Sequence, residues 1–265
     1  MQPHRTTHLK RASPITPQSV PSQTRTKSHT QMPPWHRPKS LERPQTWHSF
    51  KTIDPDTSQL ARYHVQDLPE ECREEAVDLL GRHFLPDEPL CRALRIPEDP
   101  TSSSELRRIW RELTGQRIAQ VCYREASDEI VALDLLNVVG KGDRLEVQSE
   151  RLGRVFKVGE LLCERGDLFE RYKAEFLLSS GGLLVMPKYR GFKIATEMLR
   201  TRRVICEAMG LKLSATVFTS PGSQTAAKKV GFKEEVVMSY EELRTEHDFP
   251  EVNYKFVKLM TFLVE

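Results

Sequence analysis

Residues 185–199, VMPKYRGFKIATEML, carry an apolar run through a proline and an Arg-Gly pair directly into a helical pattern. A helix begins with four unpaired N–H groups and the positive end of its dipole, so a small basic turn there suits an anion, phosphate above all. Gly191 lets the backbone come close to such a ligand. The pattern predicts a strand, a phosphate-binding turn and a helix, with an ordinary glycine-closed turn as the alternative.

A basic segment precedes the rest of the chain. Residues 1–53 are crowded with Pro, Ser, Thr, Gln and His and carry nine Lys or Arg against one acid, Glu42, for a charge of +8. Since the whole chain of 265 residues has a formal charge of +3, residues 54–265 carry −5. A segment with so few apolar residues cannot bury enough surface to fold. We therefore expect a disordered basic tail over 1–53 and one folded domain over 54–265.

Cysteine usage and hydropathy indicate the compartment. The five cysteines are odd in number and form no C-x-x-C pair, which favours reduced thiols over a zinc site. No window approaches the ~18 apolar residues of a membrane span, and a secretory core is absent. We expect a cytoplasmic protein that binds no metal. A mitochondrial leader is the alternative interpretation of the basic tail, but its prolines oppose the amphipathic helix that such a leader needs.

Hydrophobic periodicity and turn residues divide the rest of the chain into alternating elements. Helices are predicted over residues 67–84, 102–113, 158–172 with a break at Gly166, 194–209 and 224–230. Strands are predicted over 117–123, 130–139, 174–185, 211–218, 234–238 and 252–264. Gly181 and Gly182 inside one strand indicate a bulge or a distorted edge. This order predicts an α/β or α+β domain, in which helices cover both faces of a mixed sheet.

Residues 185–199 resemble the acetyl-CoA signature of the GCN5-related N-acetyltransferases, V-x-P-x-Y-R-G-x-G-I-G/A before a helix. The matching residues are Val185, Pro187, Tyr189, Arg190, Gly191, Ile194 and Ala195. Lys193 stands where the family has its central glycine. The resemblance extends over about residues 60–265, because the order of elements is similar too. It implies a mainly antiparallel sheet with a splayed acetyl-CoA cleft.

Two further segments narrow the resemblance. HFLPDEPLCRAL, residues 83–94, resembles the F-x-x-D-E-P-L segment of the insect arylalkylamine N-acetyltransferases, the dopamine N-acetyltransferase group. SQTAAKKVGFKEE, residues 223–235, is similar to the S-x-x-x-x-x-K-x-G-F ending of that group. The resemblance implies transfer of an acetyl group from acetyl-CoA to a primary arylalkylamine of the dopamine, serotonin, tyramine or tryptamine type.

The same resemblance implies how acetyl-CoA binds. Main-chain groups of Leu184 and Val185 would pair with the pantetheine arm, and backbone N–H groups of the following turn would surround the pyrophosphate. The residues of that turn are Arg190, Gly191, Phe192, Lys193, Ile194 and Ala195. The lysine in place of the family's glycine would add a positive charge near the phosphates.

Acetyl transfer requires a group that accepts the proton of the attacking amine, and Glu88 is the candidate base. Pro89 biases Glu88 toward an extended conformation beside the first predicted helix. A surface carboxylate in a loop between helices is the alternative, and the resemblance favours the base.

Three hydroxyl residues follow strand 211–218. Thr219 and Ser223 are candidates for a catalytic role, and Ser220 is a candidate for a cofactor contact. Capping of the next helix explains these residues equally well. The tyrosine that supplies the thiolate proton in many related enzymes has no counterpart, because Phe232 stands at that place.

Other functions remain open beside the arylalkylamine acetyltransferase. One alternative keeps the fold and the reaction but has a polyamine, an amino acid or a protein lysine as the acetyl acceptor. Alternatively the chain is a degenerate module that binds CoA without activity, which the replacement at Lys193 favours. We expect a small-molecule amine as the partner, no specific nucleic acid, no membrane and a monomeric protein.

Overall fold

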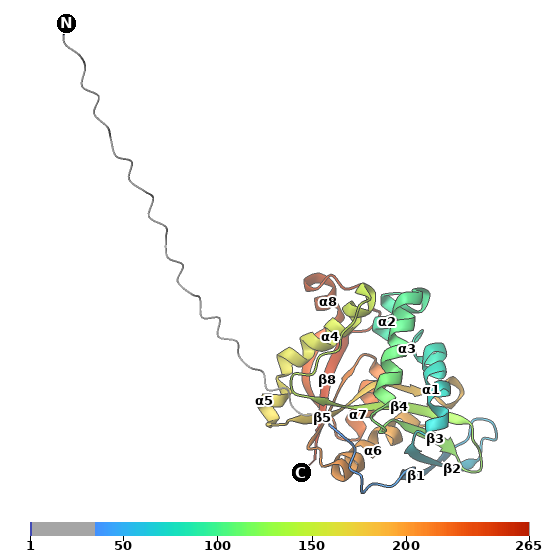
Figure 1. Cartoon of the computed structure of the whole chain (residues 1–265). Helices are drawn as coiled ribbons and strands as arrows, with labels where there is room; N and C mark the ends of the chain where they lie inside the picture. Colours follow the sequence, from blue (N-terminus) through green and yellow to red (C-terminus); the bar gives the residue numbers. More distant parts are fainter. Residues whose placement is uncertain (2–34, 265) are drawn as a thin grey trace. The chain divides into compact units, whose positions relative to one another are not determined.

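The computed structural model describes Met1 and residues 35–264, and the part from Trp35 onward contains one eight-stranded sheet (Figure 1). Its strands are β1 (Thr46–Ile53), β2 (Leu60–Asp67), β3 (Gln120–Arg124), β4 (Ile130–Gly140), β5 (Phe176–Val185), β6 (Leu213–Phe218), β7 (Lys233–Ser239) and β8 (Phe256–Leu263). They lie in the order β1-β2-β3-β4-β5-β6-β8-β7. Neighbouring strands are antiparallel except β5 and β6, which are parallel. The predicted mixed, mainly antiparallel sheet is confirmed.

Helices cover both faces of this sheet. The α-helices are α1 (Arg73–Leu79), α2 (Pro89–Ala93), α3 (Pro100–Thr114), α4 (Glu150–Gly166), α5 (Leu168–Tyr172), α6 (Ile194–Met209), α7 (Pro221–Lys229) and α8 (Tyr240–Glu246). Short helical turns are η1 (Glu70–Cys72), η2 (Leu80–Phe84), η3 (Ile96–Glu98) and η4 (Pro187–Tyr189). Buried side chains of α1, α3, α4 and α8 share one core cluster with the sheet, whereas those of α6 and α7 pack in separate clusters.

The helix ends follow their capping residues. α6 has the predicted bounds, and Gly210, at a φ of 67°, ends it in the left-handed conformation. α4 begins eight residues before its predicted start at 158, because the Ser149 side chain caps it by accepting from the Leu152 N–H at 3.3 Å. The predicted break after Gly166 is confirmed. Helix α8 was not predicted from the sequence, although Ser239 caps it in the same way.

The folded part of the chain begins before the boundary predicted after residue 53. β1 pairs with β2 from Thr46 to Ile53, so these residues belong to the sheet and the prediction of a disordered tail is wrong for them. Only Trp47 is buried along β1, which lies at the edge of the sheet, so the strand lacks a clear alternation of apolar residues. The remainder of the predicted tail, residues 2–34, lies outside the described residues.

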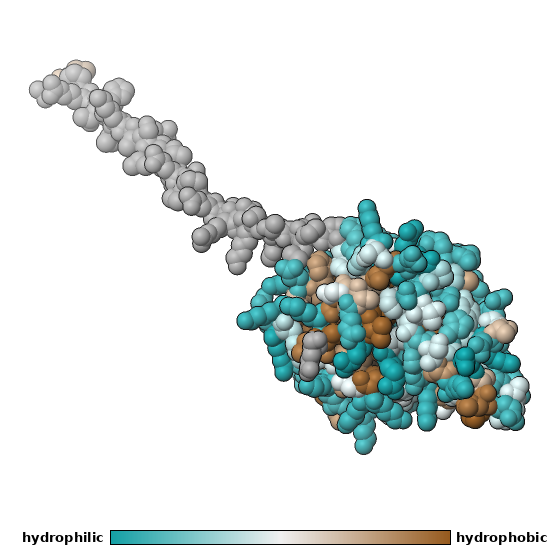
Figure 2. All heavy atoms as spheres, turned by 90° about the horizontal axis from the view of Figure 1, so that it is seen from below, coloured by the Kyte–Doolittle hydropathy of each residue, from teal (hydrophilic) through white to brown (hydrophobic). Residues whose placement is uncertain are grey.

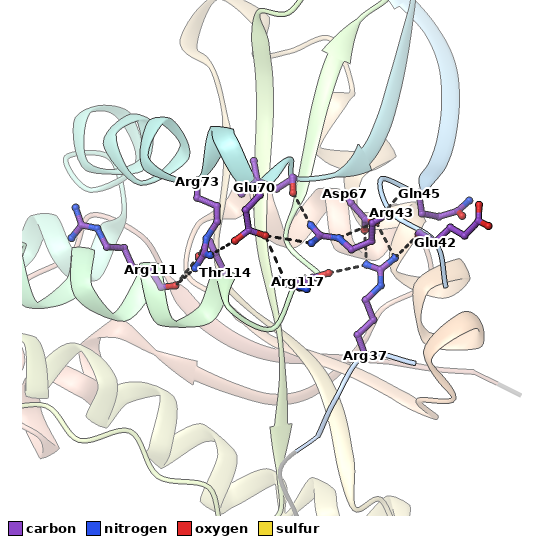
Figure 3. A network of polar contacts seen from close by, with 11 residues as sticks. Arg37, Glu42, Arg43, Gln45, Asp67, Glu70, Arg73, Arg111, Thr114 and Arg117 are labelled. Carbon is purple, nitrogen blue, oxygen red and sulfur yellow. Dashed lines mark hydrogen bonds and ion pairs between the residues drawn. The ribbon is translucent and has the colours of Figure 1, made fainter. Parts of the chain in front are cut away.

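Asp67, at the end of β2, holds the segment before β1 against the domain (Figure 3). Its carboxylate is fully buried and accepts hydrogen bonds from Arg37 at 2.8 and 2.9 Å. The Trp47 indole and the Gln45 backbone N–H donate to the same carboxylate at 3.0 and 2.9 Å. A buried carboxylate is costly without such partners. Residues 35–47 are therefore a structural part of the folded unit.

The surface is mainly polar on the face shown in Figure 2, where apolar side chains gather only in small groups. Large apolar residues with exposed side chains include Ile53, Leu60, Val204 and Leu263. Within residues 35–264, the structure contains no helix with the length and apolar character required to cross a membrane.

Candidate active site

A cleft opens where β5 and β6 diverge. β5 pairs with β4 over almost its whole length, from Phe176 to Val185, but with β6 through one residue pair only, Leu178 and Ser214. The cleft has a volume of about 1120 Å³ and is lined by residues 179–185 of β5 and 216–218 of β6. Strands that separate in this way leave backbone groups free for an extended ligand. The predicted splayed cleft is confirmed.

The turn after β5 places a left-handed backbone at the edge of the cleft. Gly191 has a φ of 88°, and Lys193 has a φ of 67° and a ψ of 5° just before α6. A lysine in this region costs about 1 kcal/mol relative to glycine. Lys193 thus takes a left-handed conformation, which glycine adopts most readily, at the position where the resembled signature has glycine. This explains how the turn is formed despite the substitution.

The first turn of α6 presents its backbone N–H groups without a capping side chain. Gly191, Lys193, Ile194 and Ala195 line the cleft beside these groups. Free N–H groups at the positive end of a 16-residue helix attract an anion. The geometry therefore fits the pyrophosphate of acetyl-CoA at the predicted turn.

Phe192 is the exception among the cofactor residues predicted in this turn. It does not line the cleft. Its carbonyl accepts a hydrogen bond from the Thr52 hydroxyl of β1 at 2.8 Å, and its side chain packs in a cluster with Phe50. His48, also on β1, contacts Glu197 of α6 at 2.8 Å. The edge strand β1 thus contacts both the turn at residues 190–195, which we call the cofactor turn, and the first turn of α6.

Leu184 and Val185, the predicted pantetheine contacts, line the cleft at the end of β5. The predicted bulge lies just before them: the β4–β5 register shifts between Asp134 and Leu136, opposite Gly181 and Gly182. The Trp110 indole donates to the Gly181 carbonyl at 3.1 Å. A Cβ atom at Gly181 would lie 2.4 Å from the Leu113 Cδ1 atom, so the Leu113 side chain of α3 would have to move to admit it.

A buried ion pair at the cleft, not predicted from the sequence, connects α6 to the sheet. Arg202 of α6 and Asp134 of β4 are both buried, and the Arg202 Nη2 atom lies 3.0 Å from the Asp134 Oδ2 atom. Arg202 also donates to the Thr216 hydroxyl at 2.6 Å, and Ser180 donates to Asp134 at 2.6 Å. These contacts connect β4, β5 and β6 where β5 and β6 separate. The sequence does contain a sign of this pair. Asp134 lies inside the apolar run 130–139, and a charge in a buried strand needs a partner of opposite charge.

Glu88 lines the cleft and also caps α2. Its Oε2 atom accepts from the Cys91 N–H at 2.6 Å, whereas Oε1 is buried and has no hydrogen-bond partner among the residues that the structure describes. Burial, and next the charge of Glu88, raise the pKa of the Cys91 thiol, so this thiol stays protonated. One carboxylate oxygen holds the loop, and the other is free to accept a proton.

Asp87 differs from its neighbour Glu88 in having a cation as partner. It forms an ion pair with Arg190 at 2.7 Å, and Arg190 donates to the Val185 carbonyl at 3.1 Å. The pair connects the loop before α2 to the cofactor turn. Asp87 is half exposed, in contrast to the buried Oε1 atom of Glu88.

The three predicted hydroxyl residues line the cleft, and one of them, Ser220, caps α7. Ser220 accepts from the Ser223 N–H at 3.3 Å, and the Ser223 hydroxyl donates to the Ser220 carbonyl at 2.9 Å. Thr219 accepts through its carbonyl from the Tyr240 hydroxyl at 2.7 Å. Burial, and next the charge of Glu88, raise the pKa of Tyr240. The capping interpretation is confirmed for Ser220. Ser223 lies inside α7 and does not cap it, and both residues line the cleft.

The remaining wall of the cleft is apolar and comes from several helices. Phe84 follows α1, Trp110 lies on α3 and Phe156 on α4. Phe84 and Trp110 meet edge to face with ring centroids 6.1 Å apart. Leu106, Leu152, Val155 and Tyr254 extend this wall. We call it the apolar arm. Among residues 35–264 the structure shows no cluster of three metal-ligating side chains.

Comparison with known proteins places this geometry in a family. No protein-family model and no curated protein matches the chain. A solved structure described as arylalkylamine N-acetyltransferase 7 of the yellow fever mosquito Aedes aegypti is 37% identical, with a TM-score of 0.84, and the match covers 88% of this chain and 100% of that chain.

Two further solved structures share the fold at low identity. Arylalkylamine N-acetyltransferase 2 of Aedes aegypti is 16% identical, with a TM-score of 0.67 over 77% of this chain and 99% of that chain. A Drosophila melanogaster polyamine N-acetyltransferase is 16% identical, with a TM-score of 0.63 over 76% of this chain and 100% of that chain.

The splayed strands, the left-handed turn and the uncapped helix define a GCN5-related N-acetyltransferase. Such an enzyme transfers an acetyl group from acetyl-CoA to an amine. At 37% identity over 88% of its length with the mosquito protein, the chain belongs to the insect arylalkylamine N-acetyltransferase family.

Proposed function

We propose that this enzyme acetylates the primary amine of an arylalkylamine, with Glu88 as the general base. The observation that carries the proposal is the free, buried Oε1 atom of Glu88 on the wall of a cleft whose apolar arm is aromatic. An alkylamine with a pKa near that of lysine, about 10.4, is almost entirely protonated at pH 7. A carboxylate that accepts its proton makes the nitrogen a nucleophile.

The reaction needs no covalent enzyme intermediate. The amine nitrogen attacks the thioester carbonyl carbon, the C–N bond forms, the C–S bond breaks and CoA leaves as a thiolate. Glu88 accepts one proton from the ammonium group, directly or through a water molecule, before the nitrogen attacks. The second proton, which the nitrogen loses as the amide forms, passes to the CoA thiolate or to water. Its second oxygen stays on the Cys91 N–H, which keeps the base in place during the transfer.

The lining of the cleft favours an arylalkylamine over a polyamine. Asp87 and Glu88 are the only acidic residues among the described residues that line it, and Asp87 is already paired with Arg190. A polyamine carries a second cation, which would have to enter the apolar arm without a partner, and this is costly. An aromatic ring gains free energy in the same place through burial and edge-to-face contacts.

An amine panel tests this proposal. CoA release from acetyl-CoA is measured with tryptamine, dopamine and phenylethylamine on one side and with agmatine and putrescine on the other. We expect kcat/KM to be at least about 10-fold higher for the arylalkylamines, the ratio that one well-placed apolar contact provides. A higher kcat/KM for agmatine or putrescine would reject the assignment of an arylalkylamine as the substrate. Binding of acetyl-CoA without turnover of any amine would favour the degenerate module.

A further inference from the structure

Helix α4 presents one stripe of residues to the cleft, and this stripe has a gap in its middle. Leu152, Val155, Phe156 and Cys163 line the cleft at the spacing of one helix face. Gly159 occupies the position between Phe156 and Cys163 on the same face and lines the cleft as well. The wall of the apolar arm therefore lacks a side chain where its neighbours carry one.

The space at Gly159 is open. A Cβ atom placed there would meet no other heavy atom within 4 Å, apart from the chain neighbours and backbone of its own helix. Glycine is the least favourable residue in a helix interior after proline. Packing thus does not require glycine at this position, although α4 would be more stable with alanine.

The two other glycines of α4 show what packing does require. At Gly166 a Cβ atom would lie 2.8 Å from Leu259, so this glycine allows α4 to approach β8. Gly153 has the same open surroundings as Gly159 but does not line the cleft. Gly153 and Gly159 are therefore a matched pair in one helix that differ in their relation to the cleft.

We infer that Gly159 is a specificity-determining residue: the missing side chain makes room for the distal ring of a two-ring arylalkylamine, such as an indole amine. The inference rests on the proposed function, because it assigns the apolar arm to the aryl group. Phe84 and Trp110 line the same cleft and supply aromatic surface against which such a ring can pack. A methyl group at 159 shortens the space without disturbing the fold.

The test compares Gly159→Ala with Gly153→Ala for tryptamine, which has two fused rings, and for phenylethylamine, which has one. Gly159→Ala is expected to lower kcat/KM for tryptamine by about 10-fold or more, and for phenylethylamine by less than about 3-fold, since one methyl group in an apolar pocket has this weight when it meets the substrate. KM for acetyl-CoA stays unchanged. Gly153→Ala leaves both amines unaffected, and both variants raise the melting temperature.

Several outcomes would overturn the inference. They are an equal loss for the two amines, the same loss in Gly153→Ala, or a change confined to KM for acetyl-CoA. Gly159→Leu provides a second measurement, because a larger side chain should exclude phenylethylamine too; retained turnover of both amines in this variant rejects the assignment. Failure of the proposed function looks different, since the wild-type enzyme would then acetylate neither amine, and the inference would fall with it.

Discussion

The two sides of the cleft are built in different ways. The cofactor side is mainly backbone from one continuous stretch, β5 through the turn into α6, and its key features are two residues at positive φ, Gly191 and Lys193. The apolar arm is made of side chains from separate segments, with Phe84, Trp110 and Phe156 on different helical elements. A local motif specifies the first side, and packing of distant segments creates the second. Substitutions should accordingly separate acetyl-CoA binding from amine use.

Removal of residues 1–53 is expected to change stability and acetyl-CoA binding more than any substitution below. It tests whether the cofactor side of the cleft depends on its local motif alone or also on β1. The truncation deletes β1 together with Arg37 and Trp47, so it removes one edge of the sheet and the hydrogen-bond partners of the Asp67 carboxylate. Loss of partners of a buried charge costs about 3–5 kcal/mol. We expect a large fall in melting temperature, measured by circular dichroism, and loss of acetyl-CoA binding.

Removal of residues 1–34 is the control for this truncation. The composition of that segment predicts little change in melting temperature or turnover. Equal behaviour of the two shortened proteins would show that β1 does not support the cofactor turn.

Glu88→Gln is expected to have the next largest effect, and it tests the amine side of the cleft. The glutamine carbonyl can still accept from the Cys91 N–H, so α2 stays capped while the base is removed. Loss of a general base lowers kcat by about 100-fold or more. Steady-state kinetics with the best amine are expected to show this loss at an unchanged Kd for acetyl-CoA.

Asp87→Asn is the matched substitution in the same loop. Asp87 pairs with Arg190 of the cofactor turn, so its effect should fall on acetyl-CoA affinity, and kcat should drop much less than in Glu88→Gln. If Asp87→Asn instead shows the larger loss of kcat, the proton acceptor of this loop is Asp87.

Gly191→Val tests whether acetyl-CoA binding can be weakened without a change in amine use. A Cβ atom at Gly191 has open space, but its φ of 88° is a conformation that a β-branched residue avoids. The turn must therefore change its backbone, and we expect KM for acetyl-CoA to rise about 10-fold, which corresponds to the 1–2 kcal/mol of the left-handed region. KM for the amine should move less than about 2-fold. An equal rise in both would mean that the two sides are not separable.

A double-mutant cycle between Thr52 and Lys193 has the smallest expected effect. The Thr52 hydroxyl binds the carbonyl of Phe192, the residue before the strained lysine. Thr52→Val should raise the Kd for acetyl-CoA about 5-fold, the weight of one hydrogen bond, and Thr52→Ser should not. In the Lys193→Gly background the loss should shrink, because glycine adopts this φ without strain. Equal losses in both backgrounds would show that Thr52 does not act through Lys193.

Prediction from sequence succeeded where neighbouring residues decide the structure. The bounds of α6, the break at Gly166 and the bulge at the paired glycines follow from periodicity, capping and φ preference, which act over a few residues. It failed for β1 and β2. β1 buries only Trp47 and begins within a polar segment, whereas β2 does alternate, with Tyr63 and Val65 buried, and was overlooked.

The sequence by itself determined the fold class, the turn for acetyl-CoA and the candidacy of Glu88, because each depends on adjacent residues in a recognisable order. Only the tertiary structure decided which oxygen of Glu88 is free, that Asp134 meets Arg202, and that Gly159 opens into the cleft. The ion pair joins residues 68 apart in the chain, and the burial of the free oxygen and the opening at Gly159 depend on the elements that enclose the cleft. Their position depends on the summed packing of the sheet and its helices, which no local pattern of residues encodes.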